Sequence, residues 1–219
     1  MIVYTVEPGG RYVTTAEGFT LHPGEKRGVY VNLTNQCTCA CTFCLRSLKE
    51  MAEEHSLWLK KEPSADEVIA ELSALPWEKV EEIVFCGFGE PTMRLDVLLE
   101  ILRWIRAEHR GIKTRLNTNG LSDLFHGRDT APDFDGLLDT VSISLNASNA
   151  ERYLELTRSR FGMKSFEAML AFAEHAKKYV PDVVLTVVDH VEDDGEIERC
   201  RELCAERGLR LRVRPYEAD

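Results

Sequence analysis

The chain has 219 residues, of which 44% are hydrophobic and 29% are charged, a composition typical of a globular domain with a buried core. Its formal net charge of −10 argues against a broad electrostatic surface for nucleic acid. The sequence opens without the pattern of a signal peptide, and its longest apolar runs are too short to cross a bilayer. We therefore expect a cytoplasmic protein that does not bind a membrane.

The predicted elements begin with a β-hairpin and continue as an alternation of strands and helices. The expected strands are residues 2–5 and 12–15 in the hairpin, followed by 28–34, 81–87, 112–120, 139–147, 182–190 and 209–215. Helices are expected at about 64–75, where Ser64 and Glu67 match a capping box, and near 95–105, 165–178 and 197–204.

This order of elements predicts the fold class. Alternating strands and helices form βαβ units with a parallel sheet, and six such units fall short of the eight that close a barrel. The sequence therefore predicts an α/β fold: a partial (βα)6 TIM-like barrel of parallel strands with a short N-terminal β-hairpin extension. We expect a single domain, in which residues 1–27 form the N-terminal β extension and residues 28–219 form the partial barrel.

Four of the seven cysteines lie in the segment NQCTCACTFC, directly after the expected strand 28–34. Crowded cysteines in a chain without an export signal favour metal or redox chemistry over a disulfide framework. Active sites of α/β barrels lie on the loops that follow the strands, so this loop belongs to the expected catalytic mouth. The thiolates of Cys37, Cys41 and Cys44 can bind three irons of a [4Fe–4S] cube and leave the fourth iron free for another ligand.

Two other interpretations of the cysteine loop remain open at this point. Zinc sites usually pair two separated turns of cysteines, so ligands at positions 37, 39, 41 and 44 would be crowded. A ferredoxin-like carrier needs a fourth cysteine, for which Cys39 is near in sequence. Cys86 fits a small buried residue, and Cys200 and Cys204 fall on the apolar stripe of their helix, which favours the core over a second cluster.

The pattern Cys37-x3-Cys41-x-Phe43-Cys44 resembles the signature of the radical S-adenosylmethionine (radical SAM) superfamily, including its aromatic residue before the last cysteine. Within the superfamily the chain looks most similar to the small TatD-associated radical SAM proteins. The resemblance implies that Cys37, Cys41 and Cys44 bind a [4Fe–4S] cluster, and that S-adenosylmethionine binds the fourth iron. It also implies that Phe43 contacts the adenine, and Cys39 is then not a ligand.

The resemblance extends to the loops after the second and third barrel strands. CGFGEPT resembles the GGE motif of the family, which implies that Gly87, Gly89 and Glu90 hold the methionine amino group, although a phenylalanine separates the two glycines. Glycine there would also let the backbone approach a ligand closely. In LNTNG, Asn117 and Thr118 would lie near the methionine carboxylate, although an Asn-Gly turn explains the same residues.

The fourth barrel strand alternates between apolar and polar residues, so its polar face should line the interior of the barrel. Ser144 and Asn146 lie nearest the end of this strand. By resemblance to the family they would bond the ribose hydroxyls of the cofactor, and a hydrated barrel interior is the simpler alternative.

The last strand carries Arg210, Arg212 and Arg214 on one face. If its apolar face meets the helices, these arginines line the interior and offer a site for the carboxylate of the cofactor or for a carboxylate or phosphate of the substrate. Charges that protect an open sheet edge from pairing are the alternative. Arg214 lies closest to the mouth and is the candidate for the cofactor, and Tyr216 could stack on the adenine.

The resemblance implies a radical SAM enzyme, in which the cluster reductively cleaves S-adenosylmethionine to a 5′-deoxyadenosyl radical that abstracts hydrogen from an unidentified substrate. No catalytic residue beyond the cluster ligands is predicted. The alternatives are an activase or modifier of a macromolecule (a glycyl-radical enzyme, a peptide or an RNA) that closes the open barrel, and a non-catalytic iron–sulfur protein. The expected partners are the substrate and an electron donor such as flavodoxin or ferredoxin, and no strong nucleic-acid signal is present.

Overall fold

Eight strands form one curved sheet at the centre of the molecule. A computed structural model describes residues 1–48 and 52–215 of the chain. In sheet order the strands are β2 (Tyr12–Thr14), β1 (Val3–Val6), β3 (Arg27–Val31), β4 (Val80–Phe85), β5 (Lys113–Thr118), β6 (Thr140–Ser144), β7 (Asp182–Val188) and β8 (Arg210–Arg214). Strands β3 to β8 run parallel, whereas β1 pairs antiparallel with β2 and β3. The sheet does not close between β2 and β8, which confirms the predicted partial barrel with its N-terminal hairpin.

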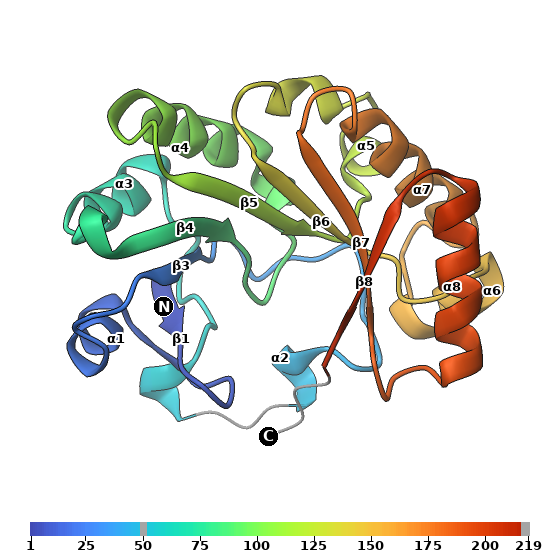
Figure 1. Ribbon diagram of the computed structural model, residues 1–219, viewed down its shortest axis with the longest axis horizontal. Helices are drawn as coiled ribbons and strands as arrows, with labels where there is room; N and C mark the ends of the chain where they lie inside the picture. Colours follow the sequence, from blue (N-terminus) through green and yellow to red (C-terminus); the bar gives the residue numbers. More distant parts are fainter. Residues whose placement is uncertain (49–51, 216–219) are drawn as a thin grey trace.

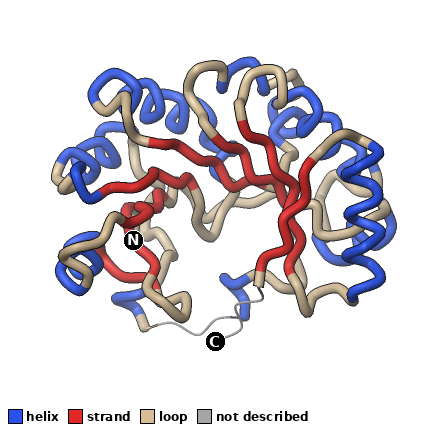
Figure 2. The backbone as a smooth tube through the Cα atoms, viewed as in Figure 1, coloured by secondary structure: helices blue, strands red, loops and turns tan. Residues whose placement is uncertain are grey.

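Helices cover the outer side of this sheet. They are α1 (Thr15–Leu21), α2 (Leu45–Leu48), α3 (Ala65–Ser73), α4 (Leu95–Glu108), α5 (Ser122–His126), α6 (Ala150–Thr157), α7 (Lys164–Ala176) and α8 (Asp194–Glu206), with 3-10 helices η1 (Glu53–His55), η2 (Trp77–Lys79), η3 (Pro91–Arg94) and η4 (Ala131–Phe134). Figures 1 and 2 show most of these helices along the convex side of the sheet, whereas the short α2 lies on the concave side. Within residues 1–48 and 52–215, no helix is long and apolar enough to cross a membrane.

Several short helices lie where the sequence predicted none. The side chain of Thr14 caps α1, so residues predicted to end the hairpin begin a helix instead. Asn149 caps α6 in the same way. Helix α5 has five residues, too few to show an apolar period. In contrast, the predicted capping box of α3 is confirmed by reciprocal bonds between Ser64 and Glu67.

The parallel strands place alternate residues on the two sides of the sheet. Ile143 of β6 points outward and is fully buried against the helices. On the inner side, Arg212 of β8 donates a hydrogen bond to the Ser142 hydroxyl of β6 at 3.3 Å, so the predicted polar interior is confirmed for these strands. Cys200 and Cys204 of α8 are buried in the hydrophobic core, as predicted.

Candidate cofactor site

The loop that carries the cysteines is held in place by its backbone. Three hydrogen bonds join it to the segment around the end of α6: Ala40 N–H to Thr157 O at 2.9 Å, Thr42 N–H to Leu156 O at 2.9 Å, and Arg160 N–H to Thr38 O at 3.0 Å. Cys39 is only 5% exposed and belongs to the core. Cys37, Cys41 and Cys44 are partly exposed. Protein contacts therefore fix the loop with Cys39 turned inward and the three predicted ligands accessible.

The positions of the thiols in the cysteine loop can be compared with the geometry of a zinc site. Among the described residues, no three cysteines bring their Sγ atoms within 4.8 Å of one another. Thiolates that share one tetrahedral zinc ion, each at about 2.3 Å, are about 3.8 Å apart. The described part of the loop therefore does not gather three thiols around one zinc ion, and the iron–sulfur assignment depends on the C-x3-C-x2-C motif.

The thiols of Cys37, Cys39 and Cys44 favour their protonated form in the folded chain. A hydrogen bond with Cys39, together with burial, raises the pKa of Cys37 well above its usual range. Burial raises the pKa of Cys44, against the opposing effect of Arg46. A hydrogen bond with Cys37 lowers the pKa of Cys39, but contact with Cys41 and burial outweigh it and raise the pKa to about 12. Metal binding at this loop must therefore release protons.

Glu90 lies at the junction of three loops and is 4% exposed. Its Oε1 accepts hydrogen bonds from the Thr92 N–H at 3.1 Å, the Thr92 hydroxyl at 2.8 Å and the Thr118 hydroxyl at 2.7 Å. Its Oε2 accepts the Asn119 N–H at 2.7 Å, and the Glu90 N–H donates to Gln36 O at 2.8 Å. Burial raises the pKa of Glu90 against these bonds. The carboxylate thus joins its own loop after β4 to the end of β5, the Glu90 N–H joins it to the loop after β3, and Oε2 retains room for one further donor.

Gly87 and Gly89 are required by the packing of two protein segments. A Cβ on Gly87 would lie 2.1 Å from the Asn32 Oδ1, and a Cβ on Gly89 would lie 2.3 Å from the Thr34 carbonyl oxygen. No side chain fits at either position unless its neighbours move. The close approach that we expected toward a ligand is therefore made toward the loop after β3, and contact of these glycines with the cofactor stays a prediction.

Asn119 is a residue of the site that the sequence prediction missed. Its side-chain amide donates to the Thr38 hydroxyl at 3.0 Å and lies 3.8 Å from Cys37 Sγ and 3.7 Å from Cys39 Sγ. Asn119 thereby ties the end of β5 to the cysteine loop. The available signal was the Asn-Gly turn, in which the sequence prediction gives a role only to the two residues before Asn119.

Tyr153 of α6 is a second missed residue. It is 1% exposed, and its hydroxyl has no hydrogen-bond partner among the described residues. Burial, followed by the proximity of Cys39 and Cys41, raises its pKa. A buried hydroxyl without a hydrogen-bond partner destabilises the fold by about 1–3 kcal/mol. The Tyr153 hydroxyl beside the cysteine loop is therefore available to donate a hydrogen bond to a group bound there. Nothing in the sequence pattern separates Tyr153 from an ordinary core aromatic.

The inner side of β4 and β5 differs from the prediction at one position. Cys86 is partly exposed and lies outside the hydrophobic core, so the expectation of a small buried residue was wrong. Cys86 follows the end of β4, where the interior is polar, and its thiol lies beside Asn117 of β5. The Asn117 Oδ1 is buried without a partner among the described residues. This orphaned polar atom in the interior fits a site that a polar cofactor completes.

The remaining predicted residues lie at or beyond the carboxyl ends of the parallel strands. Ser144 ends β6 and is partly buried, while Asn146 is buried with a φ of 65°, a left-handed conformation that Asn tolerates. Phe43 packs partly buried against the core beside the cysteines. Arg214 ends β8 and is exposed, and Tyr216 lies outside the described residues. The described members of the predicted site therefore share one end of the barrel.

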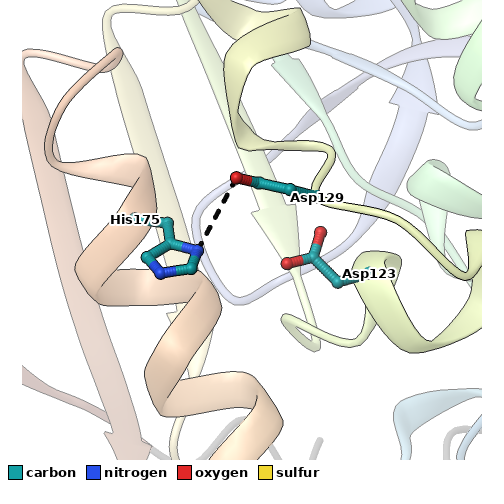
Figure 3. Close-up of side chains that lie close together, drawn as sticks. All are labelled: Asp123, Asp129 and His175. Atoms are coloured by element: carbon teal, nitrogen blue, oxygen red, sulfur yellow. Dashed lines mark ion pairs between the residues drawn. The ribbon is translucent and has the colours of Figure 1, made fainter.

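One further group of ligand-type side chains lies apart from the cysteines. Asp123 of α5, Asp129 and His175 of α7 bring their ligand atoms within 4.8 Å of one another. Figure 3 shows these three side chains close together. Asp123 already accepts two hydrogen bonds from Thr130, and Asp129 accepts the Ala131 N–H at 3.0 Å and pairs with His175 at 3.8 Å. These side chains stabilise the turn after α5, so the group is explained without an ion.

An open α/β barrel with three accessible thiols after its first parallel strand defines a barrel protein that holds a metal cluster at the carboxyl ends of its strands. The model of the Radical SAM superfamily matches residues 31–204, and the chain belongs to this superfamily. This membership supports a [4Fe–4S] cluster and S-adenosylmethionine as the cofactors, together with the need for a reductant.

The chain is similar to proteins of known name and to solved structures. It is 30% identical over 195 residues to the GTP 3′,8-cyclase of Corynebacterium glutamicum. The matched region covers 85% of this chain and 48% of that protein. A radical SAM methyltransferase from Sphaerobacter thermophilus matches with a TM-score of 0.63 and 18% identity, over 97% of this chain and 64% of that chain. Streptococcus suis SuiB bound to precursor peptide SuiA matches with a TM-score of 0.64 and 19% identity, over 92% of this chain and 42% of that chain. The chain spans about half the length of the curated relatives, and the solved structures support the fold.

Proposed function

We propose that this chain is a radical SAM enzyme that abstracts a hydrogen atom from its substrate. The observation that carries the proposal is the C-x3-C-x2-C loop, which follows the first parallel strand of an open barrel in a member of this superfamily. In this proposal Cys37, Cys41 and Cys44 bind the [4Fe–4S] cluster, and residues 1–219 act as one core domain. When bound, the cluster and S-adenosylmethionine supply the one-electron chemistry that starts the reaction.

The predicted residues at the strand ends would orient the cofactor. Glu90 would bind the methionine amino group through Oε2, which has one partner, and the unpaired Oδ1 of Asn117 is a second free acceptor nearby. The backbone of Gly87 and Gly89 is proposed for the same amino group, Asn117, Thr118 and Arg214 for the region of the carboxylate, Ser144 and Asn146 for the ribose, and Phe43 and Tyr216 for the adenine. Support comes from the position of the described residues at one end of the barrel.

The substrate in this proposal is a small molecule that enters the open interior. The name of the curated relatives, GTP 3′,8-cyclase, supports a substrate of the nucleotide type. The proposal also includes the finer assignment to the small TatD-associated radical SAM proteins, a cytoplasmic location, and flavodoxin or ferredoxin as the electron donor. A macromolecular substrate is the second candidate, because β2 and β8 leave the barrel open and SuiB was solved with a precursor peptide.

Anaerobic reconstitution tests the proposed function. The protein is loaded with iron and sulfide, reduced with dithionite and incubated with S-adenosylmethionine, and 5′-deoxyadenosine is measured by mass spectrometry. We expect 5′-deoxyadenosine from the wild type and none from Cys41→Ala. A wild type that carries a full cluster but forms no 5′-deoxyadenosine would support the non-catalytic iron–sulfur protein instead. A co-purified protein or RNA that raises the yield would favour the macromolecular substrate.

A further inference from the structure

The inner side of the last strands is basic in a chain of net charge −10. In β8, Leu211 and Val213 pack against the hydrophobic core. Because strand residues alternate, Arg210, Arg212 and Arg214 lie on the opposite face, toward the interior. The hydrogen bond from Arg212 to Ser142 of β6 agrees with this direction.

A cavity of about 620 Å³ lies between the amino-terminal halves of β4 to β8. Its charged lining consists of Glu82 and Asp182, together with Arg115, Arg210 and Arg212. Such a volume is typical of small-molecule sites. Arg115 and Arg212 each lie two residues, or about 7 Å along the strand, before residues of the proposed cofactor site. The cavity therefore adjoins that site within the same barrel.

The charges in this cavity do not balance. Arg115 pairs with Glu82 at 2.7 Å, and Arg210 pairs with Asp182. Arg212 forms no ion pair among the described residues, and its bond to the Ser142 hydroxyl is long at 3.3 Å. Arg212 is an exposed residue of β8, and partial desolvation, followed by repulsion from Arg115 and Arg214, lowers its pKa. The cavity thus holds one more cation than its two carboxylates can neutralise.

Hydrogen-bond donors in the cavity are also left over. The Nε of Arg115 is buried and has no acceptor among the described residues, although the same guanidinium bonds Glu82. Charges on an edge strand can protect it from pairing with other chains, which would explain β8. Arg115, however, lies on β5, in the middle of the sheet. Protection of an edge therefore does not account for Arg115.

We propose that this cavity binds the anionic group of the substrate, a phosphate or a carboxylate, through the guanidinium groups of Arg212 and Arg115. Guanidinium groups bind either oxyanion through paired, charge-assisted hydrogen bonds. The inference rests on the proposed radical SAM function and adds to it a class of substrate. An anion held there would present the rest of the molecule toward the carboxyl ends of the strands.

Calorimetric titration of the reconstituted protein tests the anion site. Inorganic pyrophosphate and malonate serve as probes for the phosphate and carboxylate sources, and sodium chloride at matched ionic strength is the blank. We expect saturable binding of at least one probe to the wild type. Arg212→Gln should weaken that binding by about 10-fold or more, because one charge-assisted contact is lost. Arg201→Gln, which removes an exposed arginine of α8 whose one ion pair within the described part of the chain is with Glu198 at 3.6 Å, should leave it within about 2-fold.

The preferred probe identifies the source of the anion. Lack of saturable binding by both probes overturns the proposal, and so does wild-type affinity in Arg212→Gln or an equal loss in Arg201→Gln. Circular dichroism checks the fold, and Arg212→Lys, which keeps the charge but not the planar donor pair, replaces Arg212→Gln if that variant does not fold. The titration requires no cleavage of S-adenosylmethionine, so its failure and a failure to form 5′-deoxyadenosine are separate results.

Discussion

The two ends of the barrel interior differ in how their polar groups are satisfied. At the carboxyl ends of the strands, the Glu90 carboxylate accepts four hydrogen bonds, two from Thr92 of its own loop and two from the end of β5, and Asn119 bonds to the cysteine loop. At the amino ends, Arg212 has no carboxylate partner and the Nε of Arg115 has no acceptor within the part of the chain that the structure describes. The cofactor end is therefore largely held by protein contacts, with the Asn117 Oδ1 and the Tyr153 hydroxyl left for a bound group, whereas the opposite end retains guanidinium donors among the described residues.

The largest expected effect concerns the cluster ligands at the carboxyl end. Replacing Cys37, Cys41 or Cys44 by Ala should abolish the brown chromophore of the reconstituted protein, because each change removes one of three thiolates. Cys39→Ala should keep it, since Cys39 is turned into the core. Iron per chain and the absorbance of the thiolate-to-iron charge transfer measure both. Loss of the cluster in Cys39→Ala alone would reverse the assignment of the ligands.

A substitution of Glu90 tests whether the loops at this end depend on its carboxylate. Glu90→Gln replaces one carboxylate oxygen by an NH2 group, which cannot accept the hydrogen bonds that its neighbours donate. We therefore expect the free energy of unfolding to fall by about 1–3 kcal/mol. Chemical denaturation measures the change. The exposed Glu81→Gln is the matched control and should stay near wild type. Equal stabilities of Glu90→Gln and wild type would show that the network does not hold the loops.

The contact between β5 and the cysteine loop should affect retention of the cluster. Asn119→Ala removes the bond to the Thr38 hydroxyl and the amide near Cys37, at a cost of about 1 kcal/mol. We expect the reconstituted variant to lose iron several-fold faster to a chelator, while its fold stays intact. The measurement is the half-life of the charge-transfer band. A half-life equal to that of the wild type would show that Asn119 plays no part in holding the loop.

Asp139 lies at the amino ends of the strands and, in contrast to Arg212, forms an ion pair, with Arg106. Asp139 is partly buried, which raises its pKa, but Arg106 at 2.8 Å and the Thr114 N–H at 2.7 Å outweigh burial and lower the pKa below 3.8. Asp139 therefore stabilises the fold above the unfolded-state pKa, and this contribution is lost as the pH falls through the lower folded-state value. Asp139→Asn should cost about 0.5–1 kcal/mol at pH 7, and the cost should shrink as the pH falls below the usual pKa of Asp. A cost that does not change with pH in urea unfolding would contradict this origin.

The sequence predicted the sheet because the strands show a period of two and follow one another in a regular order. Val141 and Ile143 alternate with serines in β6, so the buried and inner faces could be assigned without coordinates. The short helices α1 and α5 could not be predicted, because four to seven residues show too little of a helical period. Helix α6 was missed although Asn149 caps it, since a cap alone does not distinguish a helix from a turn.

The site was predicted where its chemistry depends on local spacing, as in the three cysteines. The setting of Glu90 was not, because its partner Asn119 lies 29 residues away and the bond depends on parallel pairing of β4 and β5. The tight approach of Gly89 to Thr34 likewise arises between loops of different strands. Contacts of this kind follow from tertiary packing and leave no signal in either segment alone.

The most direct test of the three-thiolate site is electron paramagnetic resonance spectroscopy of the reduced, reconstituted protein before and after S-adenosylmethionine is added. Three protein ligands leave one iron for the cofactor, so the spectrum of the reduced cluster should change on addition. The same change is expected in Cys39→Ala. A spectrum that stays unchanged when S-adenosylmethionine is added to the wild type, or a response that disappears only in Cys39→Ala, would contradict a cluster held by Cys37, Cys41 and Cys44 alone.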